Sequence, residues 1–529
     1  IARGSVHNLA LIIYLLCDSI IHYYCVTIAH ENSLKMVFKL ASQVTNSVKK
    51  EDTFAKLLGD FGKWQFLVFG TVSLVKLSSG WVQMAILFLT PNLTFRCKDL
   101  INNSTEEIRN STCYKDCIEY EYDTSPFENT IVSEWDLICE RRWLASLNQM
   151  MLQVGILVGS TIFGFLSDRF GRKHTFLVSI VTLIIFGLGI PFSPNYLVFT
   201  ILRFLLGVAT AGTMVVSFVI VMESVGPRYR EVTGCLFQIP FIIGHMTVPL
   251  FAYYFRNWNT YLLALGLPPL IYLGYFFVLT ESPRWLVSVG RVREATAIVT
   301  RAAKLNKLPT AKIEETLTEL AKEICAKADE PKLNYSALFQ KSLLLKTTCC
   351  CFIWLITGVT YFGFNQYISQ TSPDPFVSVA LAGAIQIPSN LVSIWLIRKL
   401  GRRLTTTVFS ILGGVFVTVL YFVPKIFALT LTLGTMGVSC AAIVASTIYI
   451  YTSELYPTVI RNMGMGACST SMRIGSMVAP FISNTSTTIP WLPTLIFGLA
   501  PVLAGLVCFL LPETRGRSLP DSIEDIRTE

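Results

Sequence analysis

Long apolar stretches dominate this chain of 529 residues. A helix needs about 20 consecutive apolar residues to cross the roughly 30 Å hydrocarbon core of a bilayer. Charged residues make up 15% of the chain, against about 25% in soluble proteins, so an all-α integral membrane protein is expected. We predict twelve transmembrane helices, over 66–89, 144–166, 175–192, 196–222, 232–256, 260–279, 346–369, 376–397, 405–422, 427–451, 462–484 and 490–511.

Basic residues gather on one side of the predicted membrane. If residue 65 lies inside, the inner loops are rich in Lys and Arg, and the short outer loops hold Lys425 alone. Cytoplasmic loops of membrane proteins carry such an excess. We therefore expect both ends of the twelve-helix unit to be cytoplasmic. The net charge of +9 follows mostly from this bias, and we do not predict nucleic-acid binding.

Long polar segments divide the chain into two six-helix halves. The apolar run near the N-terminus is set apart from this unit, since it fits either a thirteenth span or a signal-like segment. In chain order we predict an N-terminal extension at 1–35, a cytoplasmic lead-in at 36–65, a first half at 66–279 with a large extracellular loop at 90–143, a cytoplasmic linker at 280–345, a second half at 346–511 and a cytoplasmic tail at 512–529.

The large loop after the first span has the features of a segment exposed outside the cell. Its four cysteines imply two disulfides, for which three pairings are open. Its overlapping Asn-x-Ser/Thr triplets are acceptors for N-linked glycans. Both features belong to the secretory route, so we expect a plasma-membrane protein. The cysteines are Cys97, Cys113, Cys117 and Cys139, and the acceptors are Asn92, Asn102, Asn103 and Asn110.

Short basic runs follow the second span of each half, at 164–173 and at 397–403. Gly171 permits a tight turn between antiparallel helices. The carboxylate of Asp168, at the inner membrane edge, can cap a helix or pair with an Arg of the other half. Such contacts exist only while the inner side is closed, so they favour the outward-facing state. An interfacial anchor is the alternative. The predicted gating residues are Asp168, Arg169, Gly171, Arg172, Glu223, Arg402 and Glu454.

The two basic runs resemble the signature loop of the major facilitator superfamily and its repeat. Runs at 135–139, 281–286, 454–458 and 512–516 are similar to those of the organic cation, organic anion and carnitine transporter family. A cysteine-rich, glycosylated loop after the first span is also typical of that family. The resemblance, which covers roughly 60–529, implies two six-helix halves around a central cavity that work by alternating access. It also implies a small charged organic solute, moved by facilitated diffusion, exchange or sodium coupling.

Arg473, in the middle of the eleventh span, is the residue that most constrains the solute. Charges within spans are costly and usually face a cavity or a partner. The resemblance implies Arg here in anion and carnitine carriers and Asp in cation carriers. A guanidinium favours a carboxylate or sulfonate, although a structural pair with Glu454 or with a carbonyl is the alternative. Gln386 stands where the family usually has an acid, and Asn390 where strict anion carriers have Lys, so a zwitterion or a weakly selective cavity fits.

Other polar and aromatic residues within the spans complete the predicted site. Lys76 either pairs with an acid across the cavity or binds solute, whereas we interpret Arg203 as a structural or coupling residue. Trp354 and Tyr361 share a helix face, and aromatic faces attract quaternary ammonium groups. The resemblance places these two residues in the cavity. The predicted substrate-binding residues are Arg473, Trp354, Tyr361, Gln238, Gln386, Lys76 and Tyr449.

These patterns predict a plasma-membrane transporter of small organic ions, either carnitine-like zwitterions or organic cations, that works by alternating access. An organic anion transporter is the alternative, and a non-transporting receptor or scaffold with this fold is a hypothesis of another class. A sugar carrier fits the fold alone. With no P-loop, metal-ligand spacing or activated nucleophile in the sequence, we predict no enzyme, cofactor or metal. The expected partners are the solute, the lipid bilayer and sodium or a proton as a coupling ion.

Overall fold

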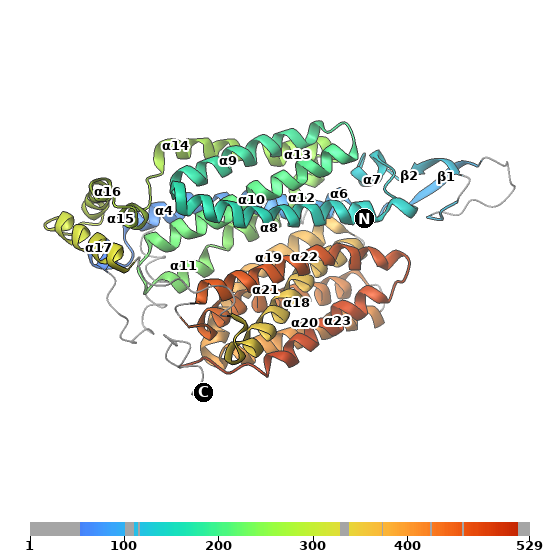
Figure 1. Ribbon diagram of the computed structural model, residues 1–529. Coiled ribbons are helices and arrows are strands. Elements are labelled where there is room, and N and C mark those ends of the chain that lie inside the picture. Colours follow the sequence, from blue (N-terminus) through green and yellow to red (C-terminus); the bar gives the residue numbers. More distant parts are fainter. Residues whose placement is uncertain are drawn as a thin grey trace.

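The computed structural model describes residues 53–100, 111–114, 117–327, 338–372, 374–423, 426–457 and 460–516. Within these ranges the chain forms two helical halves that lie against each other, with a small strand pair at one end and short helices at the other (Figure 1). We call the strand-pair end outer and the short-helix end inner. The predictions for residues 1–35, for Asn102, Asn103 and Asn110, and for Lys425 lie outside the described residues.

The first half contains the first six predicted spans. Several of these are interrupted, since the first is divided among three helices and the sixth passes through a 3₁₀ stretch at a Pro-Pro pair, where two backbone donors are missing. Its elements are α4 (Lys63–Ser73), α5 (Val75–Met84), α6 (Ile86–Leu89), α8 (Trp143–Phe170), α9 (Arg172–Gly189), α10 (Tyr196–Ser224), α11 (Arg230–Leu236), α12 (Ile239–Tyr254), α13 (Trp258–Gly266), a 3₁₀ helix (Pro268–Gly274) and α14 (Tyr275–Val278).

The second half contains the remaining six spans as long, continuous helices. They are α18 (Lys341–Thr371), α19 (Pro375–Leu400), α20 (Arg402–Phe422), α21 (Phe427–Leu455), α22 (Arg461–Asn484) and α23 (Leu492–Cys508). Ten helices of the described chain are long and apolar enough to cross a membrane. Of the other two spans, α23 is shorter, with 17 residues, and α22 carries Arg473 among many glycines and serines. The predicted all-α fold of twelve spans is thus confirmed.

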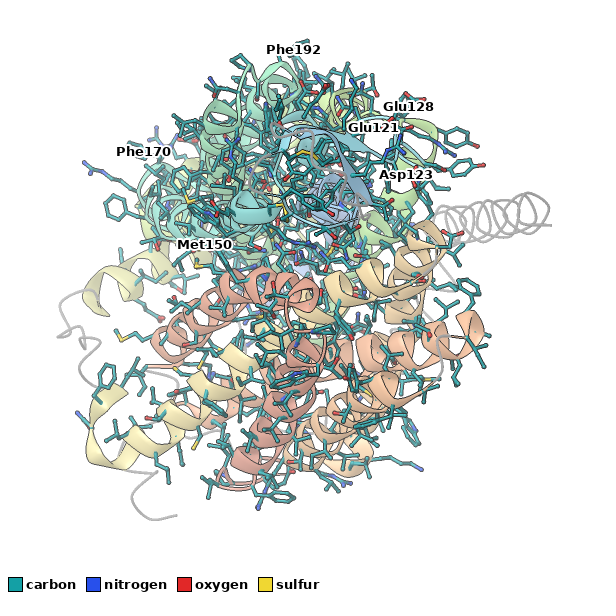
Figure 2. All side chains as sticks on the ribbon, turned by 90° about the vertical axis from the view of Figure 1, so that its right-hand side faces the viewer. Glu121, Asp123, Glu128, Met150, Phe170 and Phe192 are labelled. Carbon is teal, nitrogen blue, oxygen red and sulfur yellow. A yellow bond between two sulfur atoms is a disulfide. The ribbon has the colours of Figure 1, made fainter. Side chains whose placement is uncertain are left out.

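Large apolar side chains cover the outside of the helix bundle. Phe277 is 92% exposed and Phe192 75% exposed, although both belong to predicted spans. Figure 2 shows Phe170 and Phe192 at the margin of the first half, pointing away from the bundle. Exposed apolar surface of this extent is expected where lipid, rather than water, surrounds a protein.

The large outer loop is a folded unit held by two disulfides. Its antiparallel strands β1 (Phe95–Leu100) and β2 (Cys117–Tyr122) pair Phe95 with Tyr122. The disulfides join Cys97 to Cys117 and Cys113 to Cys139, one of the three pairings that the sequence left open. After the short helix α7 (Ile131–Glu134), Trp135 packs between Phe199 and Trp258. The outer loop is thereby fixed to the first half.

At the inner end, four short helices pack together beside the first half. They are α3 (Thr53–Leu58), α15 (Pro283–Ser288), α16 (Val292–Leu305) and α17 (Ile313–Lys327). Trp64 and Trp285 belong to their shared apolar core. The Asn306 side chain accepts a hydrogen bond from the Trp64 backbone N–H at 3.0 Å and donates to the carbonyl of Leu58 at 2.8 Å. This assembly therefore connects the linker to the beginning of α4.

The two halves meet mainly along two helix pairs, α8 with α22 and α12 with α19. Near the outer end, the hydroxyl of Ser146 on α8 donates to the carbonyl of Pro480 on α22 at 3.1 Å, and Asn484 donates to Ser146. Halfway across, an added Cβ on Gly383 of α19 would lie 2.7 Å from the backbone of Met246 on α12. The close contacts between the halves therefore extend from the outer end to the middle of the spans.

Candidate functional site

A partly buried ion pair stabilises the first inner turn, between α8 and α9. Gly171 adopts a φ of 98°, which only glycine adopts without strain. Arg172 then places its guanidinium 2.9 Å from Glu223 at the end of α10 and 3.0 Å from Asp168. Both the Arg172 and Lys173 backbone N–H groups donate to Glu281 Oε1, at 2.8 and 3.0 Å. A carboxylate therefore caps the positive N-terminus of α9.

The second inner turn, between α19 and α20, repeats this arrangement. Gly401 has a φ of 89°, and the Arg402 guanidinium lies 2.7 Å from Glu454 at the end of α21. The backbone N–H groups of Arg402 and Arg403 donate to the two carboxylate oxygens of Glu513, at 2.9 and 3.0 Å. The equal geometry in both halves is what a duplicated six-helix unit produces.

Sequence reasoning did not assign the two capping carboxylates to the inner turns. Glu281 is followed by Ser282, whose hydroxyl donates to Glu223, and Glu513 is followed by Thr514, whose hydroxyl donates to Glu454 at 2.6 Å. The repeat of Glu-Ser and Glu-Thr after the sixth and the twelfth span is the signal that could have found them. Each pair links the end of a half to its own basic turn.

The predicted contact of Asp168 with the other half does not form in this structure. The Asp168 carboxylate pairs with Arg172 of its own turn and is 77% exposed. Arg169 is exposed too, and its guanidinium lies over the neighbouring Phe170 ring. Around Gly164 and Gly466, on the inner parts of α8 and α22, an added Cβ would meet nothing within 4 Å. Open space therefore surrounds these two inner positions, whereas the outer parts of the same two helices are in contact.

Arg473 lies midway along α22 and keeps part of its surface exposed. Within the described ranges its guanidinium makes no hydrogen bond or ion pair, and the Ser476 hydroxyl donates to its backbone carbonyl. The alternative pairing with Glu454 does not form in this structure, where that carboxylate binds Arg402 and Thr514 instead. A cation without a partner at this depth is costly unless water or an anion reaches it.

Tyr449 on α21 lies within electrostatic reach of Arg473 and is 37% exposed. Its ring packs edge-on against Trp354 of α18, with centroids 4.4 Å apart. Trp354 itself is fully buried, and its indole N–H donates to Thr452 at 2.8 Å. Although the sequence predicts that Trp354 faces the solute, the ring with an open surface is that of Tyr449.

Lys76 brings a second positive charge to the same level from the opposite half. It lies on α5, is 5% exposed, and donates to Gln238 Oε1 at 2.8 Å while its ammonium lies over the Phe237 ring. The charges of Lys76 and Arg473 are close enough to interact. Among the described residues, no carboxylate pairs with Lys76, so the predicted salt bridge across the cavity does not form.

Gln386 and Tyr361 form a buried hydrogen-bonded group in the second half. The hydroxyl of Tyr361 on α18 donates to Gln386 Oε1 at 2.7 Å, and Gln386 on α19 is 1% exposed. Tyr361 keeps part of its surface exposed.

Arg203, by contrast, is fully buried in the first half, where it donates to Asn148, Gln149 and the carbonyl of Val82. This burial agrees with a structural role for Arg203.

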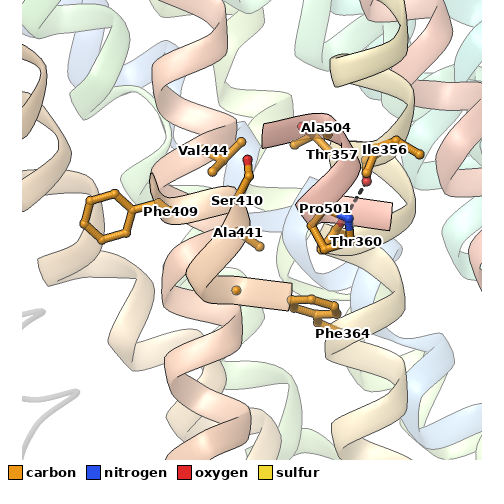
Figure 3. Close-up of a pocket in the computed structure, with 11 residues that line it drawn as sticks. Ile356, Thr357, Thr360, Phe364, Phe409, Ser410, Ala441, Val444, Pro501 and Ala504 are labelled. Atoms are coloured by element: carbon orange, nitrogen blue, oxygen red, sulfur yellow. Dashed lines mark hydrogen bonds between the residues drawn. The ribbon is translucent and has the colours of Figure 1, made fainter. Parts of the chain in front are cut away.

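The cavity drawn in Figure 3 is a separate feature inside the second half. It lies between α18, α20, α21 and α23 and is lined by apolar side chains with the hydroxyls of Thr357, Thr360 and Ser410. Its volume of about 20 Å³ holds one water molecule. Pockets for organic ligands are more than ten times larger, so this cavity is not a solute site.

Comparison with known proteins places the chain among transporters. The family described as "Sugar (and other) transporter" matches residues 96–525. An organic cation transporter protein of Drosophila melanogaster is 32% identical over 518 residues, covering 88% of this chain and 93% of the relative. The organic cation/carnitine transporter 2 of Rattus norvegicus is 30% identical, covering 90% of this chain and 93% of the relative. The chain belongs to the organic cation, organic anion and carnitine transporter family of the major facilitator superfamily.

A further curated relative and a solved structure resemble this transporter. Solute carrier family 22 member 6-A of Xenopus laevis is 34% identical over 418 residues, covering 78% of this chain and 74% of the relative. Among solved structures, the E. coli xylose transporter XylE in its inward open conformation superposes with a TM-score of 0.60 at 18% identity, covering 88% of this chain and 99% of that one. At this level of identity, the similarity shows that the two proteins share a fold and nothing further.

Proposed function

We propose that the protein moves small organic ions bearing an acidic group across the plasma membrane by alternating access. Carnitine-like zwitterions are the first candidates. The observation that carries this proposal is the Arg473 guanidinium, which is partly exposed at mid-membrane and unpaired within the described ranges. A carboxylate on the solute supplies the missing partner, and charge-assisted pairs of this kind are strong and directional.

The exposed ring of Tyr449 supports a zwitterion rather than a simple acid. It lies within electrostatic reach of Arg473, so one solute can contact both groups. Aromatic faces attract ammonium groups by about 0.5–2 kcal/mol. In this arrangement Arg473 binds the carboxylate and Tyr449 the ammonium end. Trp354 supports the Tyr449 ring from behind.

An organic anion is the second candidate, and Lys76 is the observation that favours it. The positive charges of Lys76 and Arg473, from opposite halves, repel each other, and among the described residues neither has an acidic partner. An anion placed between them relieves that repulsion. A simple organic cation would instead add to it, so we rank organic cations last.

Uptake into cells that express the protein tests this proposal. We would offer labelled carnitine, tetraethylammonium and an aromatic monocarboxylate, and compare wild type with Arg473→Ala, Arg473→Lys and a surface control, Arg301→Ala on α16. Carnitine uptake that Arg473→Ala abolishes and the control retains supports the zwitterion. Monocarboxylate uptake without carnitine uptake supports the anion. Uptake that is indifferent to Arg473→Ala rejects the proposed site.

The same assay addresses the driving force and the location. We propose coupling to sodium, to a proton or to the gradient of the solute itself. Replacing sodium by choline and changing the external pH separate these three cases. We propose the plasma membrane because the outer loop carries two disulfides and the acceptor Asn92, and surface biotinylation tests it.

A further inference from the structure

A hydrogen bond between His245 and Gln386 connects the two halves at mid-membrane. His245 lies on α12 of the first half and Gln386 on α19 of the second, and both are buried. His245 Nδ1 is 3.1 Å from Gln386 Nε2. Around this bond the two helices pack closely, with Met246 of α12 against Gly383 of α19.

The orientation of the Gln386 amide is fixed by its other contacts. Its Nε2 lies 2.9 Å from the backbone carbonyl of Ala382, and a carbonyl oxygen accepts but never donates. Its Oε1 accepts the hydroxyl proton of Tyr361. Gln386 therefore donates one N–H to Ala382 and the other to His245.

This orientation dictates the protonation of the imidazole. His245 Nδ1 must accept, so the ring is neutral and carries its proton on Nε2. Within the described residues that Nε2 atom is buried and has no hydrogen-bond partner. A second proton, on Nδ1, would point at the amide hydrogen of Gln386. The bond between the halves and the protonated ring therefore exclude each other.

We infer that His245 is a positioning residue for transport. Through Gln386 it holds the Tyr361 hydroxyl and the contact between the halves, and it does so only while its ring is neutral. The Tyr361 hydroxyl donates its hydrogen to Gln386. Its oxygen can therefore accept a hydrogen bond from a group in the central site but cannot donate one. This inference rests on the proposed function, since Tyr361 matters to transport only if a solute passes beside it.

The ionisable groups on the packed elements are few. On α5, which contacts α12 at Gly80, the charged group is Lys76, and it binds Gln238 two turns before His245. On α18 the ionisable group nearest in this network is Tyr361, which is connected to His245 by hydrogen bonds through Gln386. Arg473 of α22 acts on Lys76 across the centre. A proton on His245 would thus be a third positive charge in this region.

Uptake as a function of pH tests the protonation rule. His245→Asn offers an oxygen acceptor to Gln386 but does not titrate, and His245→Leu offers none. We expect wild-type uptake to fall on acidification, once the buried ring takes up its second proton, and His245→Asn to lose that dependence. His245→Leu should lower uptake at every pH by at least about fivefold. Equal pH profiles for wild type and His245→Asn would overturn the inference.

A second measurement requires no solute, so it separates this inference from the proposed function. In the purified protein, we expect His245→Leu and Gln386→Leu to lower the unfolding temperature, and the double variant to fall no further than the worse single variant. Thr247→Val removes a hydrogen bond to Trp81 within the first half, and its effect should add to that of Gln386→Leu. Additive effects of His245→Leu and Gln386→Leu would reject the contact. If no solute is transported but the losses of unfolding temperature from His245→Leu and Gln386→Leu are not additive, only the proposed function fails.

Discussion

Phe376 of the second half stacks on Phe88 of the first, with ring centroids 5.3 Å apart and planes inclined by 21°. Phe127 of the outer loop and Tyr253 at the end of α12 contact the same ring, at 5.5 and 5.8 Å. One side chain of the second half is therefore enclosed by three aromatic rings of the first. Together with Ser146 and its partners on α22, this cluster closes the outer end.

Removing the central ring should open the outer end. Each aromatic pair contributes about 0.5–1.5 kcal/mol, so Phe376→Ala should shift the equilibrium toward the outward-facing state by at least about fivefold. In an Asn484→Cys background, an impermeant maleimide added outside should label the protein correspondingly faster. Phe192→Ala, at an exposed outer position, is the matched control. Unchanged labelling would mean that Phe376 does not hold the gate.

A methyl group at the first inner turn should destabilise the protein. At Gly171 the positive φ costs a non-glycine residue about 1–3 kcal/mol, and the new Cβ would lie 2.5 Å from Glu281 Oε2. We expect Gly171→Ala to lower the unfolding temperature and the amount of protein at the cell surface. Gly164→Ala, seven residues earlier and in open space, should leave both measurements at the wild-type value.

Neutralising a capping carboxylate should weaken the turn that it caps. Glu513 accepts two backbone N–H groups of α20, and hydrogen bonds to a charged group are worth about 1.5–3 kcal/mol. Glu513→Gln should lower the thermal stability of the purified protein, and Glu281→Gln should do the same in the other half. Because the two turns are far apart, the losses should add in the double variant. A double variant no less stable than either single one would contradict two independent caps.

The disulfide pairing can be checked one cysteine at a time. Cys97→Ser should leave Cys117 as a free thiol, and Cys113→Ser should leave Cys139 free. Alkylation without reduction, followed by peptide mass spectrometry, identifies the free partner. Losing a disulfide in a small folded unit costs about 2–5 kcal/mol, so the amount of mature protein should fall in both variants. A free Cys117 in Cys113→Ser would show a different pairing.

The fold was largely predictable from the sequence because lipid leaves few alternatives. An apolar stretch that crosses a bilayer must satisfy its backbone internally, which makes it a helix. Gly171 and Gly401 could likewise be recognised as turns, because they stand between a helix end and a basic run. What spacing does not reveal is the partner of a side chain. Glu281 and Glu513 lie more than 100 residues from the turns that they cap.

The central site was only partly predictable for the same reason. Arg473 stands out in the sequence, since a lone charge in a span is conspicuous. The difference between Trp354 and Tyr449 is not visible there, because both are aromatic residues within predicted spans. It depends on how α18 packs against α21, which buries one ring beneath the other. The partner of His245 is similarly set by the contact between α12 and α19.

The ion pairs of the two inner turns, as this structure describes them, each lie within a single half. Rocking one half against the other can therefore proceed without breaking them, and their strength does not slow the cycle. The contacts that must be exchanged are those that join the halves, along α8 with α22, along α12 with α19 and around the Phe376 ring. A carrier built in this way keeps each half rigid and confines the changes of its cycle to the surface between the halves.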